Sequence, residues 1–193
     1  MKLEDIAVIK SAGQIKSEEI EQEGLGKFYL VNGSHVTDFG FLDEHSKFQA
    51  LYAPLKDIES KKLVAGDIIL LAKGTQLRAA LITENDVCEK NLIPSNIFLV
   101  IQMDKNYLQP EILVGYLNSH IGQANLNQLI QGTVLKNIPI KSLKTLEIVL
   151  DENLDQELLA QLFHHNISVL KNMECLITQH KSVFNAAIEK FIK

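Results

Sequence analysis

The sequence predicts an α+β fold, with short strands and helices over residues 1–150 and one long helix over residues 151–193. The chain has 193 residues, of which 46% are hydrophobic and 22% charged, as in globular proteins that bury a core. Before residue 150, short apolar runs alternate with turn-forming residues. After it, a single helical pattern continues without glycine or proline. These three observations carry the prediction.

The first part contains apolar runs that are bounded by Gly, Asn, Asp, Ser or Pro, which supply turns. They predict strands over residues 27–31, 67–73, 79–83 and 97–102.

Pro110 suits the first turn of a helix, and Leu113, Leu117 and Ile121 follow it at a spacing of four residues. This predicts a helix over residues 110–121. A second short helix is predicted over residues 122–131, and residues 134–140 and 146–150 are predicted to be extended.

In the last part, apolar residues recur every seven positions, which makes a rod of roughly 57 Å for about 38 helical residues. With Leu159 as position a, the filled positions are a (Leu159, Asn166, Met173, His180, Ala187), d (Leu162, Val169, Leu176, Val183) and e (Phe163, Leu170, Ile177, Phe184, Phe191). Three stripes exceed what a two-stranded seam needs, so the helix should touch both a partner helix and its own domain. The alternative is a helix that wraps along its own domain. His180 and Asn166 either set the register of a seam or face solvent.

Composition and motifs exclude several classes of protein. The N-terminus lacks the apolar run of a signal peptide, no stretch approaches a membrane span, and Cys88 and Cys175 show no metal or redox spacing. We therefore expect a cytoplasmic protein with two reduced thiols. No phosphate-binding loop, dinucleotide fingerprint or hydrolase motif is present, and the histidines are scattered. The sequence thus supports no enzyme, cofactor or metal.

The charges are unevenly distributed. The net charge of −5 argues against an isolated nucleic-acid-binding domain, which would usually be basic. However, residues 61–83 carry four basic residues against Asp67 alone, and residues 90–144 carry five lysines against Asp104 and Glu111. An acidic chain can still present one basic face.

The segment after the strand at 67–73 is the most informative loop. Gly74 would let backbone amides approach a phosphate closely, and Lys73 supplies charge beside Thr75 and Arg78. The alternative is an ordinary β-turn.

Several segments match one family in order. They are the N-terminal LEDIAVIKSAG, Tyr29–Val31, the run LVAGDIILLAKGT at 63–75, PSNIF at 94–98, PEILVGYLNS at 110–119, QGT at 131–133, residues 138–146 and LDQ at 154–156. Together they make the chain similar to the specificity (S) subunit of type I restriction-modification systems. Family members usually carry two target recognition domains and two spacer helices, whereas this chain has one of each.

The resemblance implies a DNA-reading protein without catalytic activity. It implies a curved, partly barrel-like mixed β-sheet in the recognition domain and a long coiled-coil spacer helix. The expected partners are double-stranded DNA, the methyltransferase (M) subunits and the translocase-nuclease (R) subunit. Because the base-reading residues vary within the family, no reading code can be transferred.

Local charge and polar groups on turns then predict which residues line the DNA face. They are Asn32, Ser34, His35, Lys73, Gly74, Thr75, Arg78, Ser95, Asn96, Gln131, Thr133 and Lys136.

The helix stripes predict a homodimer that reads a bipartite palindrome. Its predicted interface residues are Leu159, Leu162, Asn166, Val169, Met173, Leu176, His180 and Val183. Pairing with a different half subunit is left open.

Two other functions are compatible with the sequence. One is a protein–protein adaptor with a coiled-coil stalk, and the other is an antirestriction decoy that binds the methyltransferase through its helix. A basic face around the Lys73 loop, Arg78 and Lys136 favours DNA binding, whereas an acidic or apolar face there favours the adaptor.

Overall fold

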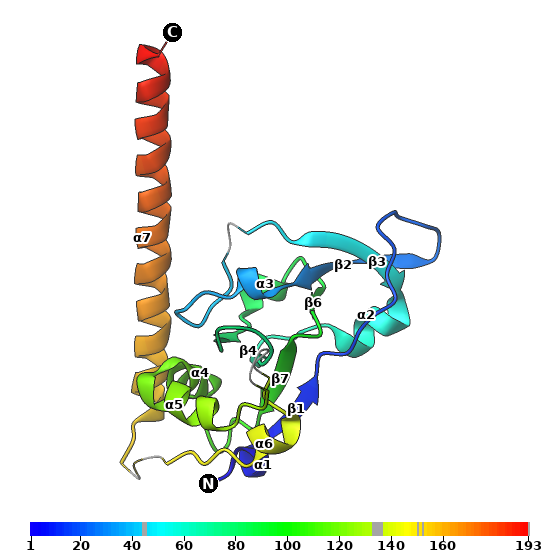
Figure 1. The fold of residues 1–193 in the computed structure, drawn as a ribbon, viewed down its shortest axis with the longest axis vertical. Helices are drawn as coiled ribbons and strands as arrows, with labels where there is room; N and C mark the ends of the chain where they lie inside the picture. Colours follow the sequence, from blue (N-terminus) through cyan, green and yellow to red (C-terminus); the bar gives the residue numbers. More distant parts are fainter. Residues whose placement is uncertain (44–45, 133–136, 150, 152, 193) are drawn as a thin grey trace.

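The structure is a computed structural model that describes residues 1–193 except 44–45, 133–136, 150, 152 and 193. Two β-sheets and several short helices form a domain, and a long C-terminal helix stands beside it (Figure 1).

The first sheet is antiparallel and has the strand order β1-β7-β4-β5. Its strands are β1 (Ala7–Ser11), β7 (Phe98–Met103), β4 (Asp67–Leu71) and β5 (Ala79–Leu81). All five residues of β4 are buried, because helices cover one face of the sheet and the second sheet covers the other. The strands predicted around β4, β5 and β7 are present, although each differs by a few residues at its ends.

The second sheet is mixed, with the order β3-β2-β6. It contains β2 (Leu25–Val31), which pairs antiparallel with β3 (Gln49–Pro54) and parallel with β6 (Leu92–Pro94). The strand predicted over residues 27–31 is β2, while β1, β3 and β6 were not predicted. The α+β class is confirmed. The two sheets do not close into a barrel. Two separate sheets therefore stand in place of the curved, partly barrel-like sheet that the resemblance implied.

The short helices are α1 (Leu3–Ile6), α2 (Leu55–Lys61), α3 (Glu84–Val87), α4 (Pro110–Asn118), α5 (His120–Gln128) and α6 (Ile140–Lys144), with a 3-10 turn η1 at Gly33–His35. They lie around the two sheets and pack apolar residues against three buried clusters.

The helix predicted over residues 110–121 is interrupted at Ser119. The Ser119 hydroxyl donates to Tyr116 O at 2.7 Å and accepts a bond from the Gly122 amide at 3.1 Å, which ends α4 and begins α5. A Cβ atom at Gly122 would lie 1.9 Å from Tyr116 O, so only glycine permits this close turn. Ile121 therefore belongs to α5 and is 71% exposed, instead of continuing the buried face of α4.

The structure differs in part from the prediction that residues 134–140 and 146–150 are extended. Ile140 begins α6, and residues 134–136 lie outside the described part of the chain. Leu146 and Ile148 run extended beside the N-terminus, where the Leu3 amide donates to Leu146 O and the Ile148 amide to Met1 O. This segment forms a single bridge between Lys2 and Glu147 and not a strand.

The long helix α7 spans Gln156–Phe191, which corresponds to about 54 Å for its 36 residues. Its first turn is capped by Asp155, whose carboxylate accepts a bond from the Leu158 amide at 2.9 Å. The lower half lies beside α4, and the upper half extends beyond the domain (Figure 1). The division of the chain at residue 150 stays a prediction.

The lower half of α7 packs on the domain through one stripe. Ile167 is 7% exposed and Phe163 packs against the core. His164 Nε2 lies 2.8 Å from Glu111 Oε1 of α4, and the side chain of Gln156 bonds the backbone of Tyr107 and Gln109. Beyond Cys175, every described residue of α7 is exposed. The alternative of a helix wrapped along its own domain therefore holds for the lower half only.

A turn at residues 36–42 lies between the domain and α7. Gly40 has a φ of +94°, and a Cβ there would lie 2.7 Å from Val114 Cγ1 of α4 and 3.4 Å from Phe163 Cζ of α7. Gly40 O also accepts a bond from the Leu81 amide at the edge of β5. The Lys171 ammonium lies 5.3 Å from the ring centroid of Phe41. This turn, which we call the joint loop, contacts both the sheet and the helix.

Candidate nucleic-acid interface

The loops that carry the predicted DNA-binding residues meet at one end of the sheets. The Ser95 amide donates to Val31 O at 2.9 Å, which joins the end of β2 to the turn between β6 and β7. The Ala72 amide donates to Ile97 O at 3.0 Å, and the Ile138 amide donates to Ala72 O at 2.9 Å. Backbone hydrogen bonds thus hold the loops at 32–35, 72–78 and 95–97 together with residues 131 and 137–138 in one cluster.

Five of the ten predicted residues that the structure describes present polar side chains to solvent. Ser34, Lys73, Thr75, Asn96 and Gln131 are exposed. Asn32 and Ser95 are half-buried, and the Ser95 hydroxyl oxygen has no hydrogen-bond partner among the described residues. Thr133 and Lys136 lie outside the described residues. The fold therefore brings together residues that are far apart in sequence, and we call this surface the polar loop face.

Gly74 lies at the tip of the loop between β4 and β5. Its φ is +143°, a conformation that residues with a Cβ rarely adopt, and nothing lies within 4 Å of the position that a Cβ would take. The space beside the Gly74 Cα is therefore empty, and the approach of its backbone to a phosphate stays a prediction. The neighbouring Lys73 amide donates to Ile97 O at 3.2 Å, which fixes the base of the loop.

His35 has a structural position in the η1 turn. Its side chain is 5% exposed, stacks on Phe48 at 4.4 Å between ring centroids, and accepts a bond from the Asn32 amide at Nδ1. Burial lowers the pKa of His35 below its usual value. The ring shapes the turn that presents Ser34 and is not available to contact DNA.

Arg78 is also engaged within the chain. Its Nε lies 2.5 Å from Asp38 Oδ1, an ion pair without hydrogen-bond alignment, and Nη1 donates to Val36 O at 3.1 Å. Nη2 contacts Gln76 Oε1. Asp38 thus offsets the Arg78 charge. In this arrangement the guanidinium binds Val36 and Asp38 and so stabilises the joint loop. The polar loop face is consequently rich in amides and hydroxyls, with Lys73 as its exposed cation among the described residues.

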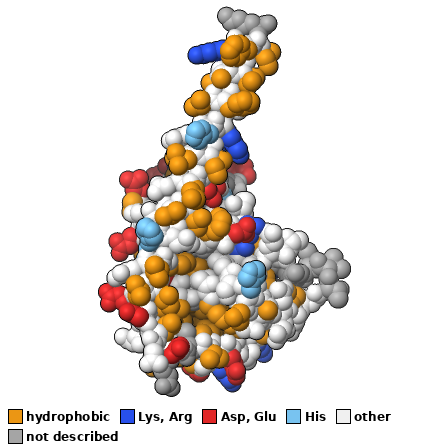
Figure 2. Space-filling model, turned by 90° about the vertical axis from the view of Figure 1, so that its left-hand side faces the viewer, with side chains coloured by type: hydrophobic (Ala, Val, Ile, Leu, Met, Phe, Trp, Pro, Cys, Tyr) orange, Lys and Arg blue, Asp and Glu red, His pale blue; other side chains and the backbone are white. Residues whose placement is uncertain are grey.

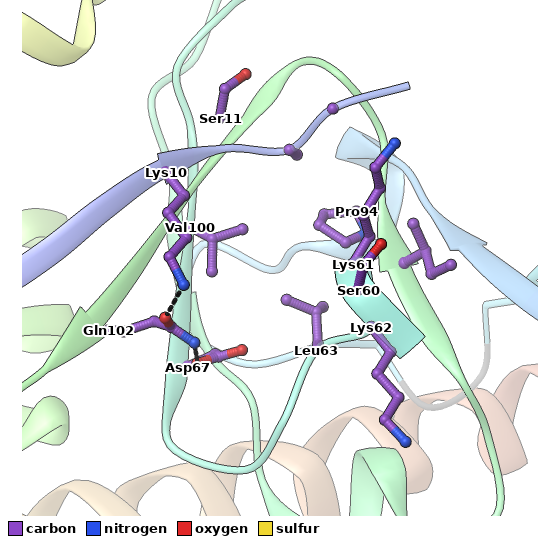
Figure 3. A pocket seen from close by; sticks show the side chains of 13 residues that line it. Lys10, Ser11, Ser60, Lys61, Lys62, Leu63, Asp67, Pro94, Val100 and Gln102 are labelled. Atoms are coloured by element: carbon purple, nitrogen blue, oxygen red, sulfur yellow. Dashed lines mark hydrogen bonds between the residues drawn. The ribbon is translucent and has the colours of Figure 1, made fainter. Parts of the chain in front are cut away.

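A second cationic feature lies next to this face and was not predicted as a unit. Lys10 of β1 and Lys61 and Lys62 at the end of α2 surround a small pocket of about 90 Å³ (Figure 3). Lys10 Nζ donates to Gln102 Oε1 at 2.6 Å, and Gln102 Nε2 donates to Asp67 Oδ1 at 2.9 Å. The basic segment noted in the sequence, residues 61–83, includes Lys61 and Lys62 but not Lys10. Only the folded sheet brings Lys10 of β1 close to α2.

A groove connects the two features. Gly13 and Pro94 line both the lysine pocket and a neighbouring groove, which is also lined by Ser95 and Asn96 of the polar loop face. The lysine pocket and the polar loop face are therefore neighbours on one surface, joined by a groove with both apolar and polar lining.

The predicted dimer residues lie along α7 and face solvent. Leu162, Met173, Leu176 and Val183 are between 52% and 69% exposed, and Leu159 and Val169 are 36% and 37% exposed. Asn166 and His180 on the same stripe are exposed as well. Hydrophobic side chains follow the length of α7 and continue onto the domain beside its lower end (Figure 2).

At that lower end lies an apolar groove of about 520 Å³ between α4 and the start of α7. It is lined by Leu108, Glu111, Ile112, Gly115, Tyr116, Ser119, Ile148, Val149, Asp151, Leu154, Leu159, Leu162, Phe163 and Asn166. The predicted interface residues Leu159, Leu162 and Asn166 thus belong to this groove too, so the apolar surface of the helix is continuous with it.

Two other kinds of feature are absent from the described part of the chain. No helix there is long and apolar enough to cross a membrane. No group of three or more His, Cys, Asp or Glu side chains is placed to hold a metal ion among the same residues.

Comparison with known proteins gives a clear likeness to a solved structure. No family profile and no curated protein sequence matches the chain. Among solved structures, the crystal structure of the type I restriction-modification system S subunit from M. genitalium superposes with a TM-score of 0.60 at 20% sequence identity. The match covers 94% of this chain and 42% of that one, so the chain spans less than half the length of that protein. The resemblance predicted from the sequence is therefore confirmed at the level of the fold: the chain folds like part of a type I S subunit.

Proposed function

We propose that this protein is a DNA-specificity subunit of a type I restriction-modification complex, which reads one half-site per chain and dimerises to read a bipartite site. The observation that carries the proposal is the S-subunit fold over 94% of the chain. In this role the protein selects the DNA sequence and performs no catalysis, while methyltransferase and translocase-nuclease subunits carry out the chemistry.

The polar loop face supports a base-reading role. Asparagine, glutamine, serine and threonine side chains form hydrogen bonds with base edges, and loops on a rigid scaffold often carry such contacts. Ser34, Thr75, Asn96 and Gln131 lie on this face, next to the empty space beside Gly74.

Phosphate contacts would come from fewer groups. Among the described residues, Lys73 on the face and Lys10, Lys61 and Lys62 around the neighbouring pocket are the cations that this surface offers. Phosphate neutralisation governs affinity and its salt dependence. The modest positive charge fits a subunit whose methyltransferase partners hold much of the DNA backbone.

The exposed stripe on α7 supports dimerisation. Monomeric proteins rarely leave a continuous apolar patch of this kind in water. Two-fold pairing of identical helices would bury the stripe and close the assembly. Antiparallel helices of about 54 Å would hold the two domains further apart than one DNA turn of about 34–36 Å. Identical domains related by a two-fold axis would then read an inverted repeat separated by unread bases.

The test uses the purified chain together with the DNA adenine methyltransferase encoded nearest to it in its own genome. The complex is presented with a library of randomised duplexes, and the retained DNA is sequenced. We expect an inverted repeat with a fixed central gap to be enriched and then methylated in both halves.

Each other outcome contradicts the proposal in a different way. A methyltransferase that binds the chain but loses its DNA binding would identify a decoy. A chain that binds neither DNA nor methyltransferase would favour the adaptor.

A further inference from the structure

The upper half of α7 continues the stripe that packs on the domain in the lower half. Phe163, Ile167 and Leu170 face the domain and are buried or half-buried. The same helical positions recur further along as Ile177, Phe184, Ile188 and Phe191, which are 54%, 65%, 40% and 86% exposed. We call these four residues the distal stripe. Because the domain of the same chain does not reach that far, they lack the contact that their counterparts make.

The distal stripe is separate from the predicted seam. The seam residues, such as Val169 and Leu176, lie about 100° around the helix from the domain-facing stripe, since each residue turns the helix by about that angle. A partner helix on the seam therefore leaves the distal stripe uncovered unless something else lies beside it.

Antiparallel two-fold pairing brings the domain of the second copy to that position. A two-fold axis across the middle of the seam leaves both domains on the same side of the helix pair, one at each end. If Met173 packs against Leu176 of the second copy, Val183 packs against Asn166 of the second copy. Phe184 to Phe191 then lie opposite residues 158–165 of the second copy, where the apolar groove begins.

The charges favour the same orientation. Residues 151–163 carry four acidic and no basic residues, whereas residues 178–193 carry three lysines and one glutamate. Glu111 and Asp151 line the groove, and the Glu111 Oε2 atom is buried without a hydrogen-bond partner among the described residues. In the register above, Lys190 lies opposite Leu159, another residue of the groove. A parallel pair would place like charges together at both ends.

We propose that the upper end of α7, through the distal stripe, docks into the apolar groove between α4 and α7 of a second copy of this chain. Each helix end then fills the groove of the other chain, so the two chains make two symmetric contacts besides the seam. This inference rests on the proposed homodimer and adds the place where its helix ends bind.

The first test compares two double variants at the same end of the helix. Phe184→Ser with Phe191→Ser removes two aromatic groups from the distal stripe. The matched control, Gln179→Ser with Ala186→Ser, changes exposed residues on the opposite side. Sedimentation should show the dimer dissociation constant raised at least tenfold by the first pair and less than threefold by the second. Equal values for both pairs would overturn the docking, and the seam could still hold a dimer.

The second test locates the contact by cross-linking. In a background with Cys88→Ser and Cys175→Ser, one chain carries Phe191→Cys and the other carries Gly115→Cys. Gly115 lines the groove, is exposed, and has open space within 4 Å of the position that a Cβ would take, so cysteine fits there. A short bismaleimide should join the two chains when they are mixed and should join neither variant to itself.

The other cross-linking results separate the two proposals. Phe191→Cys chains that cross-link to one another would indicate parallel helices and overturn the docking. A dimer by sedimentation without any cross-link would overturn the docking alone. A monomer by sedimentation would overturn the homodimer, and the docking with it.

Discussion

The two halves of α7 have the same sequence pattern but different surroundings. In the lower half, Phe163 and Ile167 pack on the domain and the seam residues face solvent. In the upper half, both stripes face solvent, as the exposure of Val183 and Phe184 shows. The pattern is uniform along the helix although the contacts are not. The upper half of α7 therefore presents an apolar surface that the described part of its own chain does not cover.

The largest effect should come from charges on the seam. We expect Val169→Asp with Leu176→Asp to raise the dimer dissociation constant at least about 1,000-fold, or about 4 kcal/mol, because unpaired carboxylates would be buried between the helices. The domain should remain folded, since Phe163 and Ile167 keep their contacts. Light scattering and circular dichroism measure the two effects. The control, Thr178→Asp with Asn185→Asp, places the same charges on the exposed side of α7 opposite Val169 and Leu176, and an equal loss there would contradict the seam.

The next effect compares the halves directly. In the monomeric seam variant, Ile167→Ala should lower the free energy of unfolding by about 2–4 kcal/mol, because it leaves a cavity between helix and domain. Ile177→Ala, on the same stripe in the upper half, should cost less than about 1 kcal/mol. Urea unfolding measures both values. Similar values for the two variants would show that the upper half also packs on its own domain.

A smaller effect concerns the polar surface. Lys73→Ala, and separately Lys10→Ala, should each lower the slope of log affinity against log salt by about one unit if the lysine contacts a phosphate. Fluorescence anisotropy with the selected duplex and the methyltransferase complex measures the slope. For Lys73→Ala the control is Lys105→Ala, at the opposite end of β4 and β7. An unchanged slope for Lys73→Ala removes the loop from the DNA contact.

The smallest effect is the pH dependence that His35 gives to stability. Because burial lowers the pKa of His35 in the folded chain, the unfolded chain binds the proton more readily. Stability should therefore fall as the pH drops through the ordinary histidine value of about 6.5 towards the lower pKa of the folded state. Urea midpoints at pH 7.5 and at pH 5 measure the change. His35→Gln should reduce this dependence, whereas His120→Gln, at an exposed site, should retain it.

The sequence predicted the strands that form apolar runs, including the edge strand β5, but missed the edge strands β1, β3 and β6. The continuous apolar runs of β4 and β7 are unambiguous, since every residue of β4 is buried. β1 and β3 are edge strands with mixed polar and apolar residues, and β6 contains Pro94, which argued against a strand. Their pairing depends on partners that are distant in sequence.

The candidate site was predicted unevenly for the same reason. Turn residues such as Lys73 and Asn96 were identified because turns follow from local sequence. The engagement of Arg78 by Asp38 and the burial of His35 depend on tertiary contacts that no local pattern reveals. The lysine pocket and the apolar groove combine elements from several parts of the chain, so they became visible only in the fold.

The joint loop has a mechanical consequence for the proposed dimer. A rotation of about 5° at the base of a rod of about 54 Å moves its far end by about 5 Å. That exceeds the rise of one base pair, about 3.4 Å. Gly40, wedged against Val114 and Phe163, leaves little freedom for such a rotation. The stiffness of the joint loop, which lies beside the lower half of α7 and holds none of the predicted DNA-contacting residues, would then set the number of base pairs between the two half-sites. Substitutions at Gly40 would alter the tolerated spacing while leaving the recognised bases unchanged.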